Sequence, residues 1–169
     1  MAKRSEFKVA VAKDNHVFAA AHFITFPGHR CERLHGHNYR TRVAVEGGLN
    51  PEAYFVLDFS DLKQLTRRLV DEIDHRVLLP LHNPKIQVAE VGESVTVAYL
   101  GTPRYVFPRA DCALLPVPNT TVEMMAQYLA HRLRREIAAM AGSALSLTAI
   151  EVEVEENFGQ SATYREALT

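Results

Sequence analysis

The chain has 169 residues, of which 47% are hydrophobic and 23% are charged, and its 19 basic side chains are balanced by 20 acidic ones. This length suits a single domain spanning residues 1–169, and the neutral charge balance argues against a nucleic-acid partner. The sequence has no long apolar run and no hydrophobic leader, which predicts no membrane association. Its two cysteines are too few for a disulfide framework and predict a reducing, cytoplasmic setting.

The first part of the chain has the alternating pattern that is typical of β-strands. Residues 7–12 and 17–23 place apolar side chains at every second position, and residues 35–46 do so opposite a polar face. Residues 24–34 contain a Pro-Gly pair and predict a loop. We therefore expect antiparallel strands with one buried and one solvated face.

The middle of the chain predicts a helix followed by a proline-rich segment. The helix begins at Asp58 or Ser60 and ends around residues 74–75. Residues 80–118 hold six of the eight prolines and two strands that form a hairpin around Gly101. We interpret residues 86–116 as an insertion into the domain.

A second helix and a last strand complete the predicted elements. The helix covers residues 122–140 and is capped by Gly142, and the strand covers residues 150–155 with Glu151, Glu153 and Glu155 facing water. The order of elements predicts an α+β fold in which helices cover one face of an antiparallel sheet.

Two histidines separated by one glycine form the first candidate metal site. Residues two apart in a strand project from the same face, so His35 and His37 are close enough to share a metal ion. His22, in phase with apolar residues of its own strand, could supply a third nitrogen, and three nitrogens with an open position are the arrangement of a catalytic zinc. The alternative is that all three are ordinary strand or core histidines.

A cysteine four residues before this histidine pair has three interpretations. Cys31 is a buried inert thiol, a fourth zinc ligand, or a nucleophile or base whose pKa is lowered by the metal, Arg30 or Arg33. The residues alone leave these alternatives open. Cys112 has no comparable neighbours and is taken as incidental.

Four further residues, at three places in the chain, carry candidate acid–base or binding groups. His75 follows the first predicted helix, where it either caps the helix or works with Asp74 in proton transfer. Glu156 is in phase with the buried positions of the last strand, which directs its carboxylate inward, toward a ligand with paired N–H donors or toward an arginine. Glu123 fits a capping box with Thr120 and is the second candidate for substrate binding.

Together these motifs resemble the 6-pyruvoyltetrahydropterin synthase and 6-carboxytetrahydropterin synthase family. The resemblance is carried by FAAAH (18–22), CERLHGHNY (31–39), LDF (57–59), IDHRVL (73–78), PNTTVE (118–123) and a closing Glu156-x7-Tyr164. The sequence departs from the family at Thr120, where a proline is common, and in the insertion, which is longer than compact members need.

The resemblance implies a tunnelling fold, in which a four-stranded antiparallel sheet with two helices on one face, here with an inserted hairpin, assembles into a barrel-shaped homo-oligomer. The implied oligomer is a hexamer with active sites at subunit interfaces. The roles that the resemblance implies are zinc binding by His22, His35 and His37, a catalytic thiolate at Cys31, its proton-transfer partner at Asp74 and His75, and a pterin anchor at Glu156.

The implied substrate is 7,8-dihydroneopterin triphosphate, and three products are possible. The Cys31-to-His35 spacing resembles the branch that makes 6-carboxy-5,6,7,8-tetrahydropterin for queuosine-type 7-deazapurine synthesis. The alternatives are the pyruvoyl branch, which eliminates triphosphate, and cleavage through Glu32 to 6-hydroxymethyl-dihydropterin for folate. A zinc- or pterin-binding module without turnover is the non-enzymatic alternative, and the predicted helices disfavour a cupin-like metal protein.

Overall fold

The structure is a computed structural model that describes residues 6–11, 14, 16–28, 30–141 and 146–168. Its main layer is a seven-stranded sheet in the order β10-β6-β2-β5-β11-β12, with β1 also paired to β5. The strands are β1 (Phe7–Val11), β2 (Val17–His22), β5 (His35–Gly47), β6 (Arg76–Pro80), β10 (Cys112–Leu115), β11 (Leu147–Glu156) and β12 (Ser161–Ala167).

The predicted α+β class is confirmed, but the expectation of a four-stranded antiparallel sheet is wrong. The long alternating strands β2, β5 and β11 pair antiparallel as expected, whereas β6 runs parallel to both β2 and β10. The sequence of β6, RVLLP, has no alternation, because its last three residues are all buried. β12 was missed because its residues alternate only between exposed and half-buried positions.

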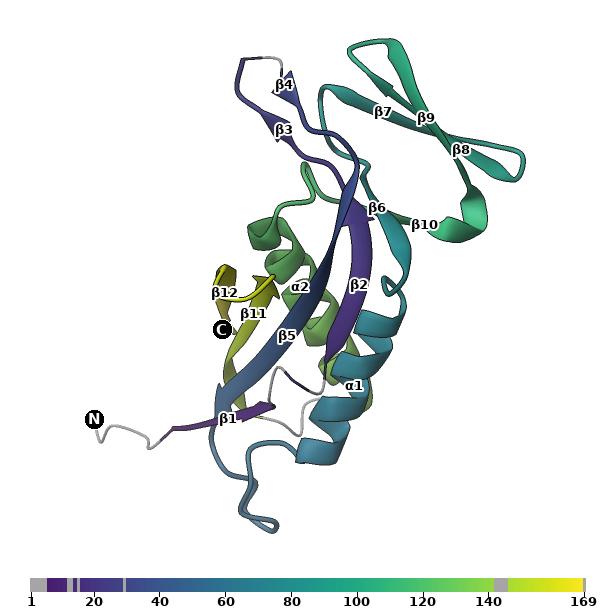
Figure 1. The fold of residues 1–169 in the computed structure, drawn as a ribbon. Helices are drawn as coiled ribbons and strands as arrows, with labels where there is room; N and C mark the ends of the chain where they lie inside the picture. The colour runs from purple at the N-terminus through teal and green to yellow at the C-terminus, as the bar shows by residue number, and fades with distance from the viewer. Residues whose placement is uncertain (1–5, 12–13, 15, 29, 142–145, 169) are drawn as a thin grey trace.

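Two helices, α1 (Phe59–Asp71) and α2 (Val122–Ala141), lie on the same side of the sheet (Figure 1). The Asp58 carboxylate caps α1 by accepting a hydrogen bond from the Ser60 N–H at 2.6 Å, and α1 ends before the predicted residues 74–75. The predicted cap at Gly142 lies outside the described residues. Within the described ranges, no helix has the length and apolar character needed to cross a membrane.

The hydrophobic core fills the space between the helices and the sheet. Leucines at every third or fourth position of α1 are buried against it, as are those of α2. From the sheet, the Phe18 ring stacks on Tyr39 with centroids 4.8 Å apart, and both side chains are fully buried. This core fixes the strands that carry the predicted histidines.

The predicted hairpin in the proline-rich segment is confirmed, and a third strand beside it extends it to a separate three-stranded sheet. Its strands are β7 (Ile86–Val91), β8 (Ser94–Tyr99) and β9 (Thr102–Pro108), followed by a 3-10 turn at Arg109–Asp111. The predicted loop before β5 also holds two short paired strands, β3 (Thr25–Phe26) and β4 (Arg30–Cys31). Both additions project from one end of the main sheet, where β2 ends and β5 begins (Figure 1).

A second, smaller core joins the inserted sheet to this end of the domain. It is formed by Phe23, Leu79, Ile86, Val95, Val97 and Cys112, with Cys31, Leu34 and Tyr105 packed against it. The inserted sheet is therefore attached to the segment that leads from Cys31 into β5.

Candidate metal centre and active site

Three histidines and one glutamate converge at the end of β2 and the start of β5. His22 lies directly opposite His35 in the strand register, and His37 follows two residues later on the same face. One nitrogen of each histidine and one carboxylate oxygen of Glu156 all lie within 4.8 Å of one another. The predicted grouping of the three histidines is confirmed, and the inward direction predicted for Glu156 adds it to the same cluster.

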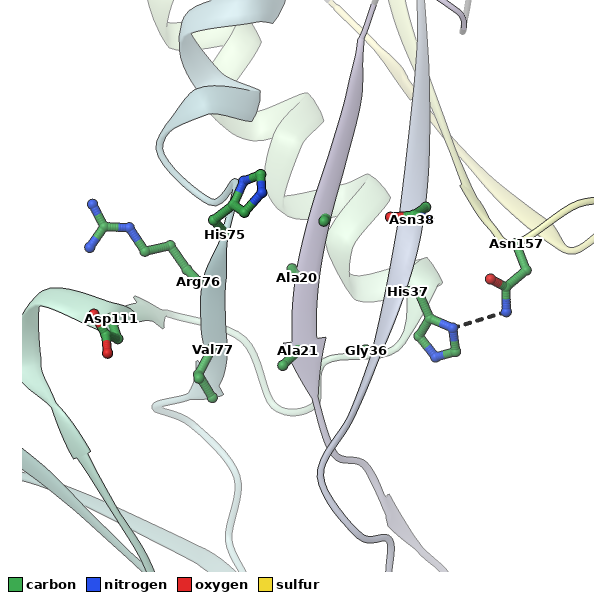
Figure 2. A pocket seen from close by; sticks show the side chains of 11 residues that line it. Ala20, Ala21, Gly36, His37, Asn38, His75, Arg76, Val77, Asp111 and Asn157 are labelled. Carbon is green, nitrogen blue, oxygen red and sulfur yellow. Dashed lines mark hydrogen bonds between the residues drawn. The ribbon is translucent and has the colours of Figure 1, made fainter.

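Each imidazole is oriented by a contact at its Nδ1 atom. Nδ1 of His22 lies 2.7 Å from the Thr120 carbonyl oxygen, and Nδ1 of His35 lies 2.9 Å from that of Arg33. Nδ1 of His37 lies 2.9 Å from the side-chain amide of Asn157 (Figure 2). For His22 and His35 the partner is a carbonyl oxygen, which accepts from Nδ1–H and leaves Nε2 to face the cluster, as in ligating histidines. At His37 the partner atom is the Asn157 amide nitrogen, a hydrogen-bond donor, so this contact does not follow the same pattern.

The centre of the cluster fits a divalent cation. Among the described residues, Nε2 of His22 and of His37 are buried without a well-aligned hydrogen-bond partner. Glu156 Oε1 lies 3.5 Å and 2.5 Å from these two atoms. Imidazole nitrogens with one carboxylate oxygen are a donor set that suits zinc, so these four residues could hold a metal ion.

The electrostatics of the cluster favour the protonation states that a metal needs. Burial lowers the pKa of His37, and the neighbouring His22 and His35 lower it further, although Glu156 opposes them. Contact with His22, supported by the other imidazoles, lowers the pKa of Glu156 despite its burial. A neutral imidazole and an ionised carboxylate are both competent ligands.

Cys31 ends β4, four residues before His35 in the chain, and among the described residues its sulfur does not join the converging ligand atoms. Burial raises the pKa of the Cys31 thiol, and Arg104 acts against burial. The interpretation that Arg30 or Arg33 lowers this pKa is therefore wrong. The Arg30 guanidinium instead lies 4.3 Å from the centroid of the Phe26 ring.

Glu32, the neighbour of Cys31, also reaches the cluster. Its Oε2 atom lies 3.9 Å from Nε2 of His35. A thiol and a carboxylate, two groups that can exchange protons, are therefore neighbours in the chain shortly before His35.

Asp74 and His75 form a pair at the start of β6. Asp74 Oδ1 accepts a hydrogen bond from the Ala19 N–H at 2.9 Å and lies 2.9 Å from His75 Nδ1. Burial would raise the pKa of Asp74, but the Ala19 and His75 contacts outweigh it and the pKa is lowered. Because α1 ends at Asp71, His75 lies beyond the last turn, which argues against the capping alternative.

The pair does not meet the metal centre within one chain. His75 and His37 lie on either side of β2 (Figure 2), on the border of a hollow of about 520 Å³ in the sheet surface. The His75 side chain is 82% exposed. The structure therefore presents His75 to the surface and does not bring it to Cys31.

Glu123 is exposed in the first turn of α2, and the predicted capping box around it is wrong. The helix begins at Val122, so the residue before it is Thr121, not Thr120. The Thr120 hydroxyl instead donates to the Phe23 carbonyl at 3.1 Å. No local sequence pattern indicates two other contacts, those of Asn157 with His37 and of Arg104 with Glu32, because the partners are distant in the chain.

Comparisons with known proteins agree with this geometry. The profile of the 6-pyruvoyl tetrahydropterin synthase family matches residues 11–167. A Methanocaldococcus jannaschii protein, named as a candidate 6-carboxy-5,6,7,8-tetrahydropterin synthase, is 32% identical over 151 residues, covering 89% of this chain and 90% of that protein. A Haemophilus influenzae 6-carboxy-5,6,7,8-tetrahydropterin synthase is 27% identical over 124 residues, covering 70% of this chain and 78% of that protein.

Solved structures show the same relationship. The 6-pyruvoyl tetrahydropterin synthase of Plasmodium vivax superposes with a TM-score of 0.88 at 29% identity, covering 97% of this chain and 99% of that one. Two further structures of that protein carry alanine or cysteine in place of a glutamate described as a catalytic residue. The profile match, the curated relatives and these structures together show that the chain belongs to the 6-pyruvoyl tetrahydropterin synthase family.

Proposed function

We propose that this protein is a zinc-dependent lyase that converts 7,8-dihydroneopterin triphosphate to 6-carboxy-5,6,7,8-tetrahydropterin, the product used in queuosine-type 7-deazapurine synthesis. The observation that carries the proposal is the convergence of one nitrogen from each of three histidines and one carboxylate oxygen of Glu156. The names of the curated relatives support the carboxy product.

In this proposal each residue of the site has its own role. His22, His35 and His37 hold zinc, which when bound would polarise the oxygen substituents of the substrate side chain. The Cys31 thiolate removes a proton from that side chain. The Glu156 carboxylate accepts hydrogen bonds from the pterin N3–H and 2-amino group, a two-donor edge that a carboxylate matches.

The remaining proton-transfer groups come from a neighbouring subunit in this proposal. Asp74 orients the exposed His75, and β2 separates this pair from the metal centre of its own chain. We infer a homo-oligomer, a hexamer by family resemblance, in which His75 of one subunit completes the site of another. Glu123, exposed at the start of α2, is a second candidate contact for the pterin.

A second candidate activity is cleavage of the same substrate to 6-hydroxymethyl-dihydropterin. It is favoured by the position of Glu32, whose carboxylate lies 3.9 Å from His35 Nε2. The Plasmodium vivax relative, in which a glutamate is described as a catalytic residue, supports this alternative. Cys31 and Glu32 could then each direct the chemistry toward a different product.

Product analysis tests the proposal directly. Purified zinc-loaded protein is incubated with 7,8-dihydroneopterin triphosphate, and the pterins are identified by mass spectrometry with and without a chelator. The carboxy product should dominate, and the chelator should abolish it. A Glu32→Gln variant should still make the carboxy product and should lose any hydroxymethyl product that the parent protein makes. A dominant pyruvoyl or hydroxymethyl product would replace the proposed activity, and the absence of any product would favour a binding module.

A further inference from the structure

The inserted sheet holds the backbone between Cys31 and β5 at two points. Arg104 Nη2 donates a hydrogen bond to the Glu32 carbonyl oxygen at 2.5 Å. The Leu34 N–H donates to the Tyr105 hydroxyl at 3.2 Å. Both holding side chains are neighbours on β9, which lies about seventy residues further along the chain.

Arg104 and the Cys31 sulfur contact the same atom, because the sulfur lies 3.7 Å from the Glu32 carbonyl oxygen that accepts the Arg104 hydrogen bond. The Arg104 guanidinium carbon is 5.9 Å from the Phe23 ring centroid and 5.3 Å from that of Tyr105, so aromatic faces cover part of it. In the described part of the chain, no carboxylate forms an ion pair with Arg104. A partly buried guanidinium without a carboxylate partner is most stable when an anion forms beside it.

The charged groups that face the Cys31 sulfur are Arg104 and Glu32. Arg104 stabilises the thiolate through charge and a side-chain hydrogen bond, whereas burial and Glu32 favour the neutral thiol. The Glu32 carboxylate also lies 3.9 Å from His35 Nε2, so replacing it would change the charge at the histidine cluster as well as at the thiol. Arg104 is therefore the group through which the insertion can act on the thiol.

We propose that Arg104 is a positioning residue that connects the inserted sheet to the reaction, holding the Cys31–Glu32 segment by the Glu32 carbonyl and serving as the counter-ion of the Cys31 thiolate. The role assigned to Cys31 rests on the proposed function. The contact between cation and thiol does not, and it can be measured without substrate.

The test measures the titration of Cys31 by alkylation. In a Cys112→Ser background Cys31 is the only cysteine, so the rate of iodoacetamide alkylation against pH reports its thiolate fraction. We expect Arg104→Gln to move the midpoint up by about one pH unit, which slows alkylation about tenfold below the midpoint. Arg104→Lys keeps the charge and should titrate near the parent. The alkylation rate at high pH, where the thiol is fully ionised, reports separately how accessible the sulfur is to iodoacetamide.

Two matched controls separate charge from local structure. Tyr105→Phe removes the Leu34 contact but leaves the cation, and Arg109→Gln removes an arginine of the same insertion that pairs with Glu90. Both should keep the parent midpoint. The proposal is overturned if Arg104→Gln titrates like the parent, or if Arg104→Lys or Tyr105→Phe raises the midpoint as much as Arg104→Gln does.

Turnover provides the second readout. If the lyase activity is present, Arg104→Gln should lower kcat about tenfold with little change in KM or zinc content, and Arg104→Lys should recover part of kcat. If no turnover is found in the parent protein, the proposed function fails while the alkylation midpoints still decide the role of Arg104. If Arg104→Gln does not fold, Arg104→Met removes the same charge, and its midpoint is compared with that of Arg104→Lys.

Discussion

Replacing Glu156 by glutamine distinguishes the two roles that its position permits, anchoring the pterin and ligating the metal. The lowered pKa of Glu156 keeps it ionised at neutral pH. As an anchor it accepts two N–H bonds, whereas glutamine offers one oxygen and turns an NH2 group toward the second donor. Hydrogen bonds to charged groups contribute about 1.5–3 kcal/mol each, so we expect a loss of about 3 kcal/mol, or about a hundredfold in kcat/KM.

The assay compares zinc content with kinetics in the same preparation. We expect the variant to retain about one zinc ion per chain, because three imidazoles suffice to hold a catalytic zinc. Glu151→Gln is the matched control, since it makes the same change on the same strand, where the carboxylate pairs with Lys8 and Arg42. It should leave both zinc content and kcat/KM near the parent values.

Two results would refute this reasoning. If zinc is lost in proportion to activity, Glu156 is a metal ligand and its role as pterin anchor fails. If kcat/KM changes less than about threefold while zinc stays, the carboxylate contributes neither function.

Three further predictions concern the thiol, the assembly and acid stability. Cys31→Ala should retain zinc while turnover falls at least about a hundredfold; loss of zinc would make Cys31 a ligand. Cys31→Ala and His75→Ala should each be inactive alone, but oligomers assembled from a mixture of the two variants should recover up to about a quarter of parent activity. No activity would be recovered if each active site were built from a single chain. Lys8 lowers the pKa of Glu151, so the ionised carboxylate stabilises the folded protein at pH values above its ordinary pKa of 4.5. This stability is lost as the pH falls through the lower pKa of the folded state. The melting temperature of Glu151→Gln should therefore depend less on acid pH than that of the parent.

The histidine and glutamate cluster could be predicted from the sequence because strand periodicity places its side chains on one face. His35 and His37 share a face whatever strand pairs with them, and His22 and Glu156 follow the same rule on their own strands. The same alternation predicts the wrong environment for Glu155. It was expected to face water, but its side chain is buried and accepts a hydrogen bond from the Gly159 N–H at the turn that follows.

Features that depend on pairing between distant segments could not be predicted in this way. The parallel strands β6 and β10 lack alternation, so nothing in the sequence separated them from loops. The contact of Arg104 with Glu32 joins residues 72 positions apart, and neither residue carries a local pattern that indicates the other. The separation of His75 from the metal centre likewise follows from the position of β6 beside β2, which only the topology reveals.

The Nδ1 contacts of the three histidines have a consequence for folding. The groups that orient the imidazoles are the Thr120 carbonyl before α2, the Arg33 carbonyl before β5 and the Asn157 amide after β11. An unfolded chain cannot assemble these segments, so the proposed metal ion would bind only the native state. A free metal concentration a thousand times the dissociation constant would then add about 4 kcal/mol to the unfolding free energy. The melting temperature should therefore rise with the free metal concentration. Chelation should increase the mobility of the start of α2 and of the segment that contains Cys31.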